Sequence, residues 1–195
     1  MKNLDNKGFS LVELIIVIAI MATLTGIVGV NYSKYIMKAK RMADVNNAVT
    51  IRDALYAAVI DGRIVVDRTK SEPKGNGIWI IVAKDYNSLP GGYNAWKFKN
   101  TTCFCGTNNC IVVDGVASGN WDVWDENIAG ILKEVGIDPY TIRVNAYNDW
   151  DWYVVQVNFT KDGKFESYGI YSGYKGKDSS YEKHNTKDSL IENYL

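Results

Sequence analysis

Lys7-Gly8-Phe9-Ser10-Leu11-Val12-Glu13-Leu14 opens an apolar run that continues to Val30, and Glu13 is the only charged residue from Phe9 to Val30. As a helix, such a run is about 30 Å long, which is enough to cross the hydrocarbon core of a bilayer. A carboxylate inside a segment of this kind costs about 2.5–3.5 kcal/mol on insertion scales. The sequence therefore predicts that the charge of Glu13 has a partner.

Two simpler explanations of the run are a secretory signal peptide and a plain signal anchor. A secretory peptide has a shorter apolar region, and no small-x-small cleavage site follows before the charged residues begin at Lys34. A single-span anchor remains an alternative, although it gives no reason to keep a carboxylate near the start of the span.

The stretch from Lys7 to Leu14 resembles the class III leader and helix start of type IV prepilins, which read Gly, Phe, Thr or Ser, Leu, Val or Ile, Glu, Leu before an apolar helix. In that family a prepilin peptidase cuts after the glycine and methylates the new amino terminus. The resemblance implies cleavage between Gly8 and Phe9, with N-methylated Phe9 as the first residue. It also implies that Glu13 pairs with the terminal amine of a neighbouring subunit, which offsets part of the cost of burying either charge.

The chain departs from the family pattern in two respects. Many pilins carry a proline about twenty residues into the mature helix, whereas this region has Gly26 and Gly29 and no proline. Basic residues also follow the run more often than they precede it, and a positive-inside count alone would place the N-terminus outside. The resemblance implies the opposite orientation, with a cytoplasmic N-terminus, because the peptidase acts on the cytoplasmic face.

Apolar residues recur at steps of three and four from Tyr32 to Val59, and polar residues fill the other positions. This pattern predicts that the helix continues as an amphipathic helix to about Ile60 and ends at Asp61-Gly62. The expected organisation is a leader over 1–8, a transmembrane or filament-core helix over 9–30, the amphipathic half of that helix over 31–61, and a globular α+β head over 62–195.

The head shows both strand and helix patterns. An apolar periodicity predicts a helix from Val123 to Val135, capped by Asp122 or Asp125 and stopped by Gly136. Asp162-Gly163 predicts a hairpin between the last two strands. The expected strands are Ile78–Val82, Ile111–Val113, Ile142–Tyr147, Trp152–Thr160 and Lys164–Tyr171. We therefore expect an α+β fold with a long N-terminal helix packed on a C-terminal antiparallel sheet, which is also the fold that the resemblance implies.

Cys103, Cys105 and Cys110 lie in a stretch whose composition is typical of a loop. A disulfide from Cys110 to Cys105 or to Cys103 would staple that loop and leave one thiol, whereas a Cys103–Cys105 bridge would be cramped. The alternative is a structural zinc site completed by His184, the only histidine of the chain. Cys-x-Cys is tighter than the usual ligand spacing, and His184 is far away in sequence, so we expect the staple.

The formal net charge of zero disfavours a strongly basic nucleic-acid interface, and no nucleic-acid partner is expected. No nucleophile–base constellation, phosphate loop or paired-carboxylate site is present, so we expect a structural protein and not an enzyme tethered by an anchor. Apart from the zinc alternative, no cofactor is expected.

The resemblance implies a type IV pilus subunit, major or minor. It would be made in the cytoplasmic membrane, processed by the peptidase, and polymerised with copies of itself and other pilins by the pilus assembly machinery. The resulting surface filament would serve adhesion, aggregation or motility. A pseudopilin of type II secretion and a competence-type pilin that binds DNA are the alternatives.

Overall fold

The computed structural model describes residues 9–71, 75–89, 97–99, 101–107, 109–147 and 149–173. The chain divides into two compact units, Met1–Ala39 and Lys40–Leu195. The predicted leader, residues 1–8, lies outside the described residues, and so does His184.

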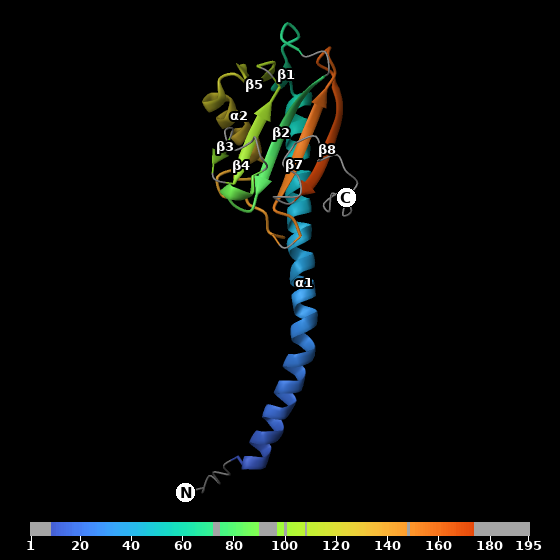
Figure 1. The fold of residues 1–195 in the computed structure, drawn as a ribbon, viewed down its shortest axis with the longest axis vertical. Coiled ribbons are helices and arrows are strands. Elements are labelled where there is room, and N and C mark those ends of the chain that lie inside the picture. Colours follow the sequence, from blue (N-terminus) through green and yellow to red (C-terminus); the bar gives the residue numbers. More distant parts are fainter. Residues whose placement is uncertain are drawn as a thin grey trace, which may run out of the picture. The chain divides into compact units, whose positions relative to one another are not determined.

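One continuous helix, α1 (Leu11–Ile60), covers most of the first unit and the start of the second (Figure 1). Its end has the geometry that the Asp61-Gly62 pair predicts. Gly62 adopts a left-handed φ of 73°, which costs a glycine little because it has no Cβ. The amide of Arg63 donates to the carbonyl of Ala58 at 2.9 Å and that of Gly62 to Val59 at 3.2 Å. These two bonds form a Schellman motif, which satisfies carbonyls that the helix end leaves free.

In the first unit, every described side chain from Phe9 to Gly26 is exposed. Among the residues described, the structure contains no helix whose length and hydropathy suffice to span a bilayer. The predicted transmembrane or filament-core stretch, residues 9–30, falls within this unit.

The second unit contains two antiparallel sheets (Figure 1). The larger sheet has the strand order β3-β4-β2-β7-β8, and a smaller one has the order β1-β5-β6. The larger sheet is built from β3 (Lys97–Lys99), β4 (Thr102–Gly106), β2 (Asn76–Ala83), β7 (Trp152–Phe159) and β8 (Phe165–Gly173). The smaller one is built from β1 (Ile64–Val66), β5 (Ile111–Val113) and β6 (Val116–Ala117), and a 3-10 turn, η1, spans Tyr86–Ser88. The α+β fold, a long helix followed by antiparallel sheets, is thus confirmed.

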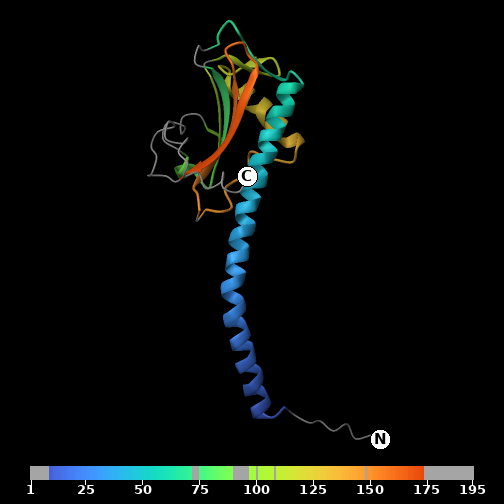
Figure 2. The ribbon, with the colours of Figure 1, turned by 90° about the vertical axis from the view of Figure 1, so that its right-hand side faces the viewer.

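The main core lies between one face of the larger sheet and the helices, α1 and α2 (Trp121–Glu134), as the view along the sheet shows (Figure 2). Alternate residues of β7, namely Tyr153, Val155, Val157 and Phe159, all face this core. From α1 the core receives Val45, Ala48, Ile51, Ala54, Leu55 and Ala58. The buried face of α1 therefore begins later than its sequence pattern suggests, because Tyr32 and Tyr35 are exposed.

The opposite face of the larger sheet carries a second buried cluster. It contains Ile81, Ala83, Leu89, Cys103, Trp152, Val154 and Tyr171. Both faces of β2 are thus buried, which explains why β2 reads as a continuous apolar run and not as an alternating one.

The predicted strand Ile142–Tyr147 is wrong, because this segment is an irregular loop. Two of its amides, those of Asn145 and Ala146, bond to a side chain where a strand would bond to a neighbouring strand. Both carboxylate oxygens of Asp44 on α1 accept the backbone N–H of Asn145, at 2.9 and 3.1 Å, and one of them accepts that of Ala146 at 2.9 Å. A side-chain acceptor of this kind competes directly with sheet pairing.

The Asp44 carboxylate is fully buried and also accepts the side-chain amide of Asn145 at 2.9 Å and the indole N–H of Trp150 at 3.0 Å. Burial raises the pKa of Asp44, and these hydrogen bonds oppose that rise. One turn earlier, Arg41 donates two 2.7 Å hydrogen bonds to Asp149. The two contacts fix the 142–150 loop to the helix.

The expected acidic cap of α2 is also wrong. Its N-cap is Asn120, which makes no side-chain capping bond, and Asp122 lies in the first turn. The end of α2 is as predicted, because Gly136 has a φ of 83° and the amide of Ile137 donates to the carbonyl of Leu132.

We predict that Asp44→Ala destabilises the second unit by roughly 2–4 kcal/mol, because it leaves two backbone amides and an indole N–H buried without their acceptor. Urea unfolding of the full chain in a neutral detergent, followed by tryptophan fluorescence, measures the change. Asp53→Ala is the matched control on the same helix, since the Asp53 side chain is 61% exposed. Equal stability of the two variants would contradict the assigned role of Asp44.

Candidate functional site

The candidate assembly site lies at the start of α1. The backbone N–H of Ser10 donates to the Glu13 carboxylate at 2.8 Å, and the N–H of Glu13 donates to the Ser10 hydroxyl at 3.2 Å. This reciprocal pair is a capping box, in which Ser10 is the cap and Glu13 reaches back to it. The Ser-x-x-Glu spacing that signals such a box is visible in the sequence, but sequence reasoning assigned no role to Ser10.

The capping box has two consequences for the predicted processing residues. The helix begins at Leu11, so Phe9 stays outside it, with 87% of its surface exposed. One oxygen of Glu13 bonds to Ser10, and among the described residues the other oxygen has no hydrogen-bond partner. Glu13 is therefore held in place by its own helix while it keeps an oxygen available for a further donor. Gly8 lies outside the described residues.

The prokaryotic N-terminal methylation motif matches residues 3–29. This match defines the chain as a protein with a class III signal and confirms the resemblance stated on sequence grounds. It supports a pilin-like prepilin, and a signal of this class implies a membrane-anchored precursor. No curated protein and no solved structure matches the chain.

The cysteines are arranged differently from the predicted loop. Cys103 and Cys105 belong to β4, and their positions two apart place both thiols on the same face of the sheet. Their Sγ atoms are 3.4 Å apart. Cys110 belongs to the main core on the other side, and its Sγ lies 3.0 Å from Asn76 Oδ1 and from the carbonyl of Thr107. No disulfide joins the three cysteines in the structure, so neither expected bridge is formed there, and the staple stays a prediction.

The environment of Cys103 disfavours thiolate chemistry. The hydrogen bond with Cys105 and, second, burial raise the pKa of Cys103 far above its usual value. The thiolate is the form that binds metals and exchanges disulfides, so a raised pKa disfavours both reactions at Cys103. Within the described part of the chain, no group of three or more histidine, cysteine or acidic side chains could hold a metal ion. The zinc alternative requires His184 and therefore stays a prediction.

We predict that the denatured, unreduced chain contains three titratable thiols, because the structure places the sulfur of Cys110 on the opposite side of the sheet from the other two. Thiol counting in denaturant, combined with elemental analysis of the native protein, checks this. A count of one thiol would show that one disulfide forms, and peptide mapping would tell a Cys110 staple from a Cys103–Cys105 bridge. Three thiols with one zinc per chain would support the metal site.

The acidic residues near the head's surface are used in different ways. Asp149 binds Arg41, and Asp151 binds Lys84. Asp125 on α2, in contrast, is only 8% exposed. Among the described residues its Oδ1 has no hydrogen-bond partner. Burial, and then repulsion from Asp122 and Glu126, raise the pKa of Asp125 to about 7.

We predict that Asp125→Asn stabilises the protein by an amount that grows from about pH 4 to pH 7 and is constant above pH 7. The reason is that the carboxyl of the wild type must lose its proton in this range, whereas the amide of the variant does not titrate. The folded state binds the Asp125 proton more tightly than the unfolded state does, so wild-type stability falls as the pH rises through this range. The difference at pH 8 should be on the order of 2–4 kcal/mol.

Urea unfolding of the full chain at several pH values measures this difference. The control is Glu166→Gln, which removes a carboxylate at an exposed position of β8 that does not act on Asp125. A stability difference that does not vary with pH would show that Asp125 titrates normally.

Proposed function

We propose that this chain is a subunit, major or minor, of a type IV pilus. It is made as a prepilin in the cytoplasmic membrane with its N-terminus in the cytoplasm. The prepilin peptidase cuts between Gly8 and Phe9 and methylates Phe9. The pilus assembly machinery then polymerises the mature chain with further copies of this chain and with other pilins. The resulting surface filament serves adhesion, aggregation or motility. The observation that carries the proposal is the methylation motif over residues 3–29.

The exposed surface of α1 supports this proposal. Its described side chains from Leu11 to Gly26 are all exposed, and most of them are apolar. Monomeric soluble proteins rarely expose a continuous apolar surface of this size. Two environments would cover this apolar surface, one after the other. The first is the lipid bilayer around the precursor, and the second is the set of neighbouring helices in a filament.

The proposed role of Glu13 is to set the position of one subunit against the next. Its carboxylate would pair with the positive amine of a neighbour's Phe9, because an unpaired charge of either sign is costly in an apolar helix bundle. The bond from Ser10 leaves one oxygen of Glu13 for that pairing and fixes its direction.

We expect the mature chain to begin at Phe9 and to carry one N-methyl group. Mass spectrometry of the N-terminal peptide from sheared surface material measures both features. A chain that keeps residues 1–8 in that fraction would contradict the proposal.

We expect Glu13→Gln to be processed normally but to assemble poorly. Glutamine can keep the capping bond with Ser10, because capping boxes accept Gln as well as Glu, but it cannot pair with a charged amine. Ser10→Ala is the matched variant, since it removes the hydroxyl that accepts the Glu13 amide and keeps the charge. The yield of sheared filaments should fall strongly for Glu13→Gln and much less for Ser10→Ala. If Ser10→Ala alone abolished assembly, the helix cap and not the charge would be the essential feature.

Immunogold electron microscopy distinguishes the proposal from its two alternatives. Long labelled surface filaments are expected for a pilus subunit. A secretion defect in a deletion strain without such filaments would indicate a pseudopilin, and loss of DNA uptake would indicate a competence pilin.

A further inference from the structure

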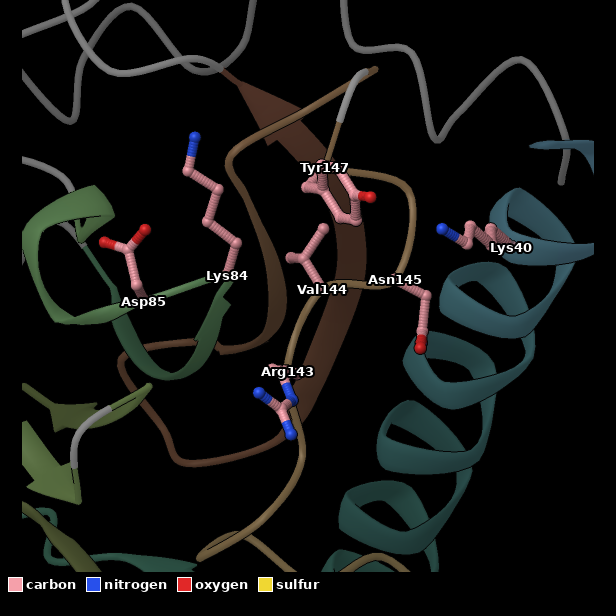
Figure 3. A pocket seen from close by; sticks show the side chains of 7 residues that line it. All are labelled: Lys40, Lys84, Asp85, Arg143, Val144, Asn145 and Tyr147. Atoms are coloured by element: carbon pink, nitrogen blue, oxygen red, sulfur yellow. The ribbon is translucent and has the colours of Figure 1, made fainter.

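A basic pocket of about 430 Å³ opens on the second unit (Figure 3). Known ligand pockets have volumes of about 300–1,000 Å³, so this one can hold a small chemical group. Three segments form its wall: α1, the end of β2 and the 142–150 loop. The described residues that line it are Lys40, Lys84, Asp85, Arg143, Val144, Asn145 and Tyr147.

The pocket's floor is fixed by contacts on its far side. Val144 is buried, and its amide donates to the carbonyl of Ala83 at 3.3 Å. Asn145 is held through its backbone and its side chain by the buried carboxylate of Asp44. A rigid floor matters for binding because little conformational entropy is lost when a ligand enters.

Two of the pocket's cations have no acidic partner among the described residues. Lys84 is neutralised by Asp151, and the Asp85 carboxylate accepts the hydroxyl of Ser88 at 2.9 Å. The ammonium of Lys40 lies 4.7 Å from the centre of the Tyr147 ring, with no carboxylate beside it. Arg143 is exposed and makes no hydrogen bond or ion pair with any described residue. A guanidinium and an ammonium that share a pocket in this way suit an oxyanion, which the guanidinium can bind with two parallel N–H groups.

The position of Lys40 in the chain favours a phospholipid as the source of that oxyanion. Between Glu13 and Asp44 the charged residues are Lys34, Lys38, Lys40 and Arg41, all basic, and they follow directly after the apolar run that ends at Val30. Basic clusters beside a membrane segment attract anionic lipids. The fold places Arg143, about a hundred residues later in the sequence, in the same pocket as Lys40.

We propose that this pocket binds the phosphate of an anionic phospholipid headgroup while the chain is a membrane precursor. The proposal rests on the membrane stage of the proposed function. Arg143 binds the phosphate oxygens, Lys40 adds a second positive charge, and the ring of Tyr147 lies beside the Lys40 ammonium. Lipid bound here orients the precursor's head at the membrane surface before assembly and is released when the subunit leaves the bilayer.

Native mass spectrometry of the full chain in a neutral detergent tests the proposal by counting retained lipids. Phosphatidylglycerol is compared with phosphatidylcholine of the same acyl chains. The wild type should retain the anionic lipid preferentially, and Arg143→Gln should weaken that retention about fivefold, the effect of one cation near a lipid surface. Arg143→Lys keeps the charge without the two parallel donors, so its lipid retention should lie between that of the wild type and that of Arg143→Gln. Lys40→Gln should weaken retention independently.

The matched control is Arg68→Gln, which removes an exposed guanidinium from the segment after β1 and should leave retention unchanged. An equal loss in Arg68→Gln, or equal retention of the two lipids, would overturn the proposal. Displacement of the lipid by equimolar inorganic phosphate would also overturn it, because the pocket would then bind a free anion and not a headgroup. So would an oligomer that depends on Arg143 in the absence of lipid, since the occupant would then be an acidic group of a second copy.

The result of the lipid-binding experiment is independent of the test of filament assembly. Loss of lipid preference in a chain that is correctly processed at Phe9 would overturn only the lipid site. Retention of the anionic lipid by a chain that is never processed would support the lipid site and contradict the pilus proposal.

Discussion

The buried carboxylate of Asp44 joins two parts of the head that no strand pairing connects. It accepts the amides of Asn145 and Ala146 and the indole of Trp150, and so holds an irregular loop against α1. A buried carboxylate is expensive unless donors surround it. The helix and the loop therefore depend on each other: the donors make the burial of the charge tolerable, and the charge gives the loop amides the partners that a sheet would otherwise provide.

The larger sheet follows from a different constraint. Both faces of β2 are covered, one by the helices and one by the cluster around Trp152. A sheet buried on both sides cannot use polar alternation to fix its register. Here the register depends on long strands: β2 and β7 pair over eight positions, from Asn76–Phe159 to Ala83–Trp152. The β7–β8 hairpin adds a shift at Phe159, which lets Phe165 pair with it across the turn.

The sequence predicts the elements whose apolar pattern is long and regular. The long helix, its end at Gly62, the α2 helix and strands β2, β5, β7 and β8 all follow from periodicity and from glycine positions. Strand β4 was missed because Cys103 and Cys105 are followed by glycine, threonine and two asparagines, a composition typical of loops. The 142–147 segment was misread because β-branched residues suggest a strand, and nothing local shows that a carboxylate a hundred positions earlier takes the amides. At the candidate site, the sequence identified Glu13 from its isolation in an apolar run. The local bond with Ser10 was visible as a spacing but was overlooked.

The placement of Arg41 and Asp44 has a mechanical consequence. The second unit begins at Lys40, so a pulling force that arrives along the chain from Ala39 acts first on the two residues that bind the 142–150 loop. Hydrogen bonds, including those of the Arg41–Asp149 pair, are directional and weaken steeply when their geometry is disturbed, whereas apolar side chains can slide past one another. The head is therefore built to resist tension stiffly at its point of entry and more gradually further along α1, where Ile51 and Leu55 lie in the apolar core. If such a subunit carried load in a filament, the strength of the connection between α1 and the rest of the head would depend on the polar contacts of Arg41 and Asp44.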